Sequence, residues 1–128
     1  MSRLLAGLLA AILGLNALVQ LGAPFWWYGL VPGVPATGPF NAHFVRDIGA
    51  AYLTAAAGLS AFAWRPASGW LGLALAAGFL TVHAAIHVFD AVCGPRLAAD
   101  VLRDLPGIYL PALVTVALLA RTPALQRR

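Results

Sequence analysis

Long apolar stretches, separated by short polar or Pro- and Gly-rich segments, dominate the pattern along this chain of 128 residues. A helix that crosses a bilayer needs about 20 mostly apolar residues, and four stretches of this kind occur. We therefore predict an all-α fold, an integral membrane four-helix bundle that forms a single transmembrane domain over residues 1-128. The predicted spans are residues 4-21, 44-64, 70-93 and 101-120.

The segment between the first two spans, residues 24-41, is rich in Pro, Gly and aromatic side chains and carries no charge. Because Pro and Gly interrupt helices, it predicts an irregular outer loop. The aromatic cluster at residues 25-28 suits the headgroup level of a bilayer. Two arrangements remain open: a loop that lies flat on the membrane, or a lid folded over the mouth of the bundle.

Composition agrees with a membrane protein, since 62% of the residues are hydrophobic and only 9% are charged, whereas soluble chains carry roughly 25% charged residues. The charges are eight Arg and four Asp, with no Lys or Glu. Basic residues this sparse cannot follow a phosphate backbone, which excludes a nucleic-acid partner despite the net charge of +4. The single cysteine, Cys93, excludes a disulfide framework and a multi-cysteine metal site.

The distribution of Arg predicts the orientation of the bundle. Four spans place both termini on one side, together with five of the eight Arg and no Asp. The opposite side receives the other three Arg and all four Asp. Since positive charge marks the cytoplasmic side, we predict cytoplasmic termini and a multi-pass protein of the bacterial inner (plasma) membrane, with its outer face toward the periplasm. The first apolar stretch exceeds the core of a typical signal peptide, so we expect it to be retained.

Polar side chains recur at helical spacing near the outer ends of all four predicted spans. Residues three or four apart share one face of a helix. At 1.5 Å per residue, several of these side chains lie roughly 5–8 Å below the outer helix ends. The four spans therefore bring polar groups to a common level. These groups are Asn16 and Gln20; His43 and Asp47; His83, His87 and Asp90; and Asp100 and Asp104.

Ionisable residues inside a bilayer are costly, and by default they mark functional sites. His-x-x-x-His and His-x-x-x-Asp are spacings by which one helix presents ligands to one ion. Imidazole and carboxylate suit Zn, Fe, Cu or Mn. The sequence therefore predicts a transition-metal site in the outer half of the bundle. Its predicted ligands are His43, Asp47, His83, His87 and Asp90, supported by Asn16, Gln20 and Arg46, with Asp104 and Tyr109 as candidates for proton transfer.

Each polar residue also has a purely structural interpretation. Asp47 or Asp90 could form an ion pair with Arg46. Acidic residues favour the start of a helix, which would explain Asp100 and Asp104. The two amides of the first span could join helices through hydrogen bonds, and the cysteine could be an inert thiol or a soft ligand.

The second and third spans are rich in Gly, Ala and Ser, so we expect close helix packing and no wide pore. Pro106 falls in the first turn of the predicted fourth span, where its missing N–H costs little. Pro111 falls in the interior of that span, where it should kink the helix and free a carbonyl near Gly107.

At the second span, the text HFVRDIGAAYLTAAAGL resembles the corresponding span of the DoxX-like small four-helix bacterial membrane proteins. In that family an Arg near the helix start precedes a Gly and an aromatic residue, here Arg46, Gly49 and Tyr52. The length and four-span layout are similar as well. The resemblance implies the architecture, and it carries over no activity and no role for the histidines of the third span.

Three classes of function follow. The first is a membrane metalloprotein whose site opens outward and could act as an enzyme on a small or lipophilic substrate. The second is a haem protein with two His as axial ligands, and the third a non-catalytic subunit of a larger membrane complex or homo-oligomer. A proton-coupled transporter is disfavoured unless the chain dimerises, and histidine-rich desaturases need more His than the three present.

Overall fold

The computed structural model describes residues 1–122, and over that range the chain forms helices and connecting turns without a strand. The connections between the long helices differ in length: residues 23–41 separate α1 from α3, whereas Arg65 alone separates α3 from α4. The elements are α1 (Ser2–Gly22), α2 (Pro24–Leu30), the 3-10 turn η1 (Val34–Thr37), α3 (Ala42–Trp64), α4 (Pro66–Cys93), α5 (Leu97–Asp104), the π-helical segment η2 (Leu105–Tyr109) and α6 (Leu110–Ala120).

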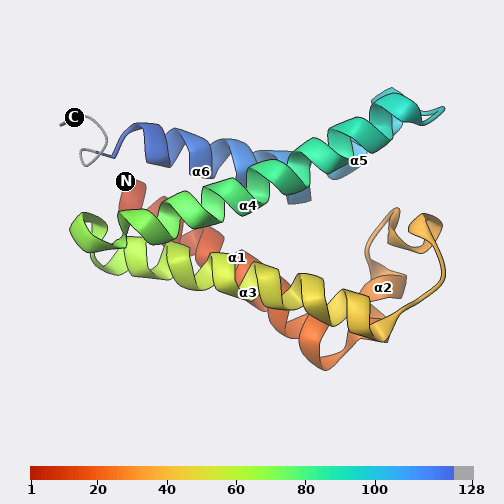
Figure 1. The fold of residues 1–128 in the computed structure, drawn as a ribbon, viewed down its shortest axis with the longest axis horizontal. Helices are drawn as coiled ribbons and strands as arrows, with labels where there is room; N and C mark the ends of the chain where they lie inside the picture. Colours follow the sequence, from red (N-terminus) through yellow and green to blue (C-terminus); the bar gives the residue numbers. More distant parts are fainter. Residues whose placement is uncertain (123–128) are drawn as a thin grey trace.

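The helices form two layers, one of α1 and α3 and one of α4 with α5 and α6 (Figure 1). α3 packs against both α1 and α4 and so joins the layers. The start of α1 and the end of α6 lie at one end of the molecule, and α2 and α5 lie at the other. We call the latter the α2–α5 end. The all-α prediction is confirmed over the described residues.

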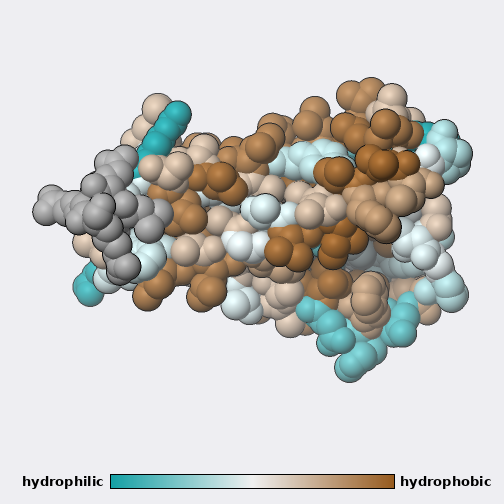
Figure 2. All heavy atoms as spheres, turned by 45° about the horizontal axis from the view of Figure 1, so that its top comes forward, coloured by the Kyte–Doolittle hydropathy of each residue, from teal (hydrophilic) through white to brown (hydrophobic). Residues whose placement is uncertain are grey.

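Three stretches are long and apolar enough to cross a membrane: α1, α4 and the run Leu97–Ala120 that contains α5 and α6. α3 has a comparable length of 23 residues but does not reach the same hydropathy, because small and polar residues replace many large apolar ones. Figure 2 shows apolar side chains along the length of one face, with hydrophilic ones mainly toward the ends and at one edge. Three stretches are thus long and apolar enough to cross a membrane, and the fourth span stays a prediction.

Close packing of α3 on α4 depends on glycines at their contact. A Cβ added to Gly58 would lie 2.5 Å from the carbonyl oxygen of Gly72, so the two backbones touch. Leu59 and Leu73, which follow these glycines in sequence, are fully buried in the core, as is Leu80. Packing rather than hydrophobicity holds helices together in lipid, and small residues permit it here as predicted.

The prediction of an irregular loop over residues 24-41 is wrong for its first part, because Pro24–Leu30 forms α2. Pro24 occupies the first turn of this helix, where its missing N–H has no intrahelical partner to lose. The remainder is irregular as expected. Gly33 adopts the left-handed conformation with φ of +88°, and η1 follows it.

The fourth apolar stretch starts earlier than predicted and is interrupted. α5 begins at Leu97, so Pro106 lies past the first turn, inside η2. There the N–H of Leu110 donates to the carbonyl of Leu105, five residues back. Pro106 and Pro111 lack the N–H groups that would continue the α-helical ladder, and one π-turn absorbs the irregularity. The expected disturbance therefore lies in the turn before Pro111.

Candidate functional site

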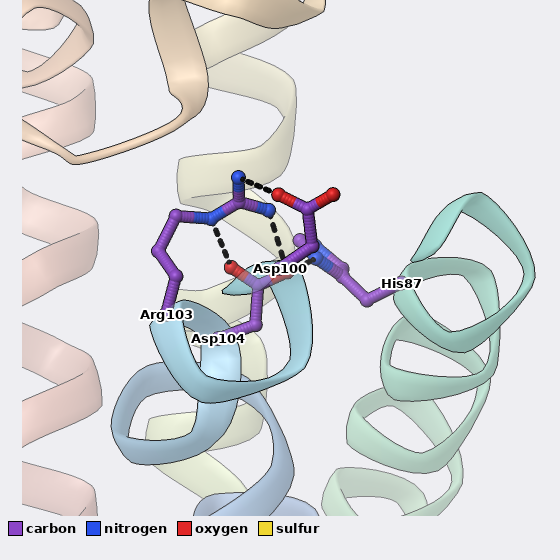
Figure 3. Close-up of polar contacts among 4 residues, drawn as sticks. All are labelled: His87, Asp100, Arg103 and Asp104. Carbon is purple, nitrogen blue, oxygen red and sulfur yellow. Dashed lines mark hydrogen bonds and ion pairs between the residues drawn. The ribbon is translucent and has the colours of Figure 1, made fainter. Parts of the chain in front are cut away.

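Four charged or ionisable side chains meet at the α2–α5 end, one from α4 and three from α5 (Figure 3). We call His87, Asp100, Arg103 and Asp104 the Asp104 cluster. Nδ1 of His87 lies 2.7 Å from Oδ2 of Asp104. Arg103 donates from Nε to Oδ1 of Asp104 at 2.7 Å and from Nη2 to Oδ2 at 3.0 Å. Its Nη1 donates to Oδ1 of Asp100 at 2.7 Å, so the guanidinium bridges both carboxylates.

Asp104 is the centre of this cluster, and only 8% of the residue is exposed. An ionised carboxylate only accepts hydrogen bonds, so Nδ1 of His87 must carry a proton to bond with it. In the neutral ring, a proton on Nδ1 leaves the lone pair of the other nitrogen, Nε2, free. Asp104 thus fixes both the tautomer and the orientation of the His87 ring.

His83 lies one helical turn before His87 in α4 and contacts it ring to ring, with centroids 4.9 Å apart. The His83 ring also stacks on Phe79 at 5.8 Å and meets the edge of Tyr52 at 5.6 Å. Tyr52 is a buried residue of α3. A continuous row of rings therefore leads from the core of the bundle to the Asp104 cluster, and the two histidines share one face of α4 as predicted.

The segment between α2 and α3 reaches this cluster. A Cβ added to Gly33 would lie 2.7 Å from Nε of Arg103, so the Gly33 backbone rests against the guanidinium. Only glycine combines this close approach with a left-handed φ at low cost. The segment therefore contacts α5 at this point, and both arrangements open from the sequence stay predictions.

Hydrogen bonds and aromatic contacts hold the same segment in place. The Tyr28 hydroxyl donates to the carbonyl of Gly38 at 2.5 Å, and the Phe40 ring meets Tyr28 edge-on with centroids 5.3 Å apart. Trp27 donates from Nε1 to the Asn16 side-chain oxygen at 2.8 Å. Asn16 therefore joins α1 to α2, whereas its position in the sequence predicted a hydrogen bond between spans or support of a metal site.

The other predicted ligands lie apart from this arrangement. His43 and Asp47 form an exposed pair on α3, with 3.3 Å between His43 Nε2 and Asp47 Oδ2. Asp90 is exposed and forms no ion pair within residues 1–122. In the part of the chain that the structure describes, no group of three or more His, Cys or Asp side chains could hold a metal ion. The predicted five-ligand set therefore stays a prediction, with His83 and His87 as the members in mutual contact.

The remaining predicted site residues have different environments. Arg46 donates from Nε to the carbonyl of Leu21 at 3.2 Å, so it ties α3 to α1 where an ion pair with Asp was considered. Gln20 is fully buried, and neither atom of its amide has a hydrogen-bond partner. The hydroxyl of Tyr109 is also buried without a partner. These two side chains are the unsatisfied polar groups among the described residues.

Sequence reasoning missed Arg103 as part of the site and the pairing of His87 with Asp104. The sequence held one signal for this pairing: counted along their helices, His87 and Asp104 fall at about the same depth below the outer helix ends. Arg103 lies next to Asp104 and three residues after Asp100, a spacing typical of ion pairs on a helix. A single sequence does not state which two spans are neighbours, so the contact between α4 and α5 could not be derived.

Comparisons with protein-family models, with curated proteins and with solved structures give no match for this chain. The resemblance to the DoxX-like proteins therefore stays a prediction about architecture.

Proposed function

We propose that the protein is a multi-pass membrane protein in which α1, α3, α4 and the α5–α6 run all cross the bilayer, as in DoxX-like proteins. Three of these stretches have the required length and hydropathy. α3 packs between two of them and has nearly the same length as α1, so it would follow them across. The Arg-rich, Asp-free side favours cytoplasmic termini and a bacterial inner-membrane location.

Within this bundle, the proposed function is binding of one divalent transition-metal ion by His83 and His87 near the outer face. The observation that carries it is the bond between His87 Nδ1 and Asp104. Metal-binding histidines commonly donate their second N–H to a carboxylate, which fixes the tautomer and raises the basicity of the ligand nitrogen. Two His four residues apart on one helix face form a recurrent metal-binding pair.

Two protein ligands leave coordination positions for water or for a substrate. A metal ion with open positions polarises bound groups and lowers the pKa of bound water. That chemistry would suit an enzyme acting on a small or lipophilic substrate that reaches the site from the membrane. Asp104 would orient His87 in such a site rather than transfer protons, because both of its oxygens are already engaged by Arg103 and His87.

A haem at this pair has less support. The two axial ligands of a haem iron lie on opposite faces of the macrocycle, whereas His83 and His87 lie one turn apart on one helix. A haem would therefore need His43 together with one of them.

A structural role is the second candidate, and Arg103 favours it. The guanidinium pairs with both Asp100 and Asp104, so each carboxylate already has a cationic partner without a metal ion. In that case it would only hold α4, α5 and the segment at Gly33 together, as expected for a non-catalytic subunit.

Elemental analysis and an optical spectrum of the purified protein separate these candidates. We expect one transition-metal ion per chain and no Soret band. A Soret band would replace the proposal with the haem alternative. Protein that contains no metal and takes up none from equimolar Zn²⁺, Fe²⁺, Cu²⁺ or Mn²⁺ would leave the structural role.

A further inference from the structure

The exposed side of α3 differs from the exposed sides of the other long helices. α1 presents large aliphatic side chains, such as Ile12 and Leu15, which are 64% and 67% exposed. α3 presents mostly small or charged side chains, which we call the α3 face. The α3 face consists of His43, Arg46, Asp47, Ala50, Thr54, Ala57, Ser60 and Ala61, all of them exposed.

Such a face is poorly suited to lipid. Charged side chains are costly against hydrocarbon, and small residues favour the close approach of another helix. This argument depends on the proposed membrane placement of α3, and it is independent of the metal site. In that placement, another protein surface fits the α3 face better than acyl chains do.

The charges on the α3 face favour a second copy of this chain as the protein surface that covers it. Arg46 and Asp47 are neighbours at one end of the α3 face, and His43 pairs with Asp47 at 3.3 Å. Arg46 uses only Nε, toward the Leu21 carbonyl, within residues 1–122. In a two-fold symmetric contact the same patch of both copies meets itself. A cation and an anion that are neighbours on one copy can then each face the opposite charge on the other copy. Arg46 of each copy would then face Asp47 of its mate.

A hollow borders the same surface. A cavity of about 240 Å³ lies between α3 and α4, lined by Ala51, Thr54, Ala55, Leu75, Ala76 and Phe79. Its lining is almost entirely apolar. Leu53, next to Thr54 in α3, is 40% exposed and adds a large apolar side chain to this exposed side of the helix.

We propose that the α3 face is the contact surface of a parallel homodimer in the membrane, with Arg46 and Asp47 paired across the two-fold axis. The dimer buries the one long helix whose composition does not suit lipid. It also accounts for a charged pair that is exposed on the isolated chain.

Cysteine cross-linking in native membranes tests this proposal. In a Cys93→Ser background, Ala50→Cys, Thr54→Cys and Ala57→Cys are oxidised with copper phenanthroline, and Leu15→Cys on α1 is the matched control. We expect a cross-linked dimer for at least one α3 variant and none for the control. Arg46→Asp or Asp47→Arg should abolish the cross-link, and the double exchange should restore it.

Labelling with a water-soluble maleimide separates the failure of this inference from that of the membrane placement. If the α3 cysteines resist labelling and form no cross-link, α3 crosses the membrane and faces lipid or another protein, and the homodimer is wrong. If they label freely, the proposed fourth span is wrong, and the dimer is overturned with it. Equal cross-linking of the Leu15→Cys control would indicate random collision and also contradict the proposal.

Discussion

Asp104 determines the properties of the site at the scale of single residues. Its two oxygens accept hydrogen bonds from Arg103 and His87, so one buried carboxylate compensates a guanidinium and fixes an imidazole. The spacing of His83 and His87 on one face of α4 was predictable, because helical periodicity follows directly from sequence. The partner of His87 was not predictable, because periodicity assigns residues to faces and does not pair the helices.

Replacing Asp104 with Asn tests this account of the carboxylate. Asp104→Asn removes the negative charge opposite Arg103 and replaces one of the two acceptor oxygens with an NH2 donor, so the side chain can no longer accept from both Arg103 and His87. We expect a loss of about 2 kcal/mol in the free energy of unfolding in detergent. We also expect metal affinity at His87 to fall about 10- to 100-fold.

Asp90→Asn is the matched control, since Asp90 is exposed and forms no ion pair within residues 1–122. It should leave both quantities unchanged. Equal thermal melting of the two variants would show that the contacts of Asp104 contribute little to stability.

At the scale of elements, the apolar stretches predicted the long helices. The predictions that were wrong concern two prolines, Pro24 and Pro106. Pro24 was taken to break a helix, yet at the first position of α2 it favours one. Pro106 was placed in a first turn, but α5 begins at Leu97 and the proline falls in η2. In both cases the effect of proline depends on the true helix start, which apolar patterns locate only within a few residues.

The segment at Gly33 provides an element-scale prediction. Gly33→Ala places a methyl group against the Arg103 guanidinium, which the two Asp carboxylates hold in place. It also imposes a left-handed φ on a residue with a Cβ, at about 1–2 kcal/mol. We expect faster amide hydrogen exchange over residues 31–40 and a lower melting temperature.

Gly38→Ala separates the two effects. Gly38 also has a positive φ, +147°, but an added Cβ there would meet no atom within 4 Å. Backbone strain is therefore present in both variants, and it is larger at Gly38, whose φ and ψ fall in a region essentially limited to glycine; only Gly33→Ala disturbs Arg103. If Gly33→Ala leaves hydrogen exchange over residues 31–40 as slow as in the unaltered chain, the contact with Arg103 does not hold the segment.

At the scale of the whole molecule, charged residues are scarce, and most of the acidic ones form ion pairs. Only 9% of the residues are charged, and three of the four Asp take part in the ion pairs described here. The apolar stretches predicted an all-α membrane protein, and three stretches have the length and hydropathy to cross a bilayer. The helical spacing of the polar residues also predicted one shared polar layer, whereas in the described residues the pair on α3 forms no ion pair with the Asp104 cluster at α4 and α5.

Cobalt(II) titration of purified, metal-free protein tests the central claim most directly, because bound Co²⁺ absorbs visible light and so reports its ligands. We compare the unaltered chain with His87→Gln and with His43→Gln, whose histidine belongs to the exposed α3 pair. The account predicts saturable visible bands at one Co²⁺ per chain for the unaltered protein and for His43→Gln, and their loss in His87→Gln. Identical bands in all three proteins, or none in the unaltered chain, would contradict it.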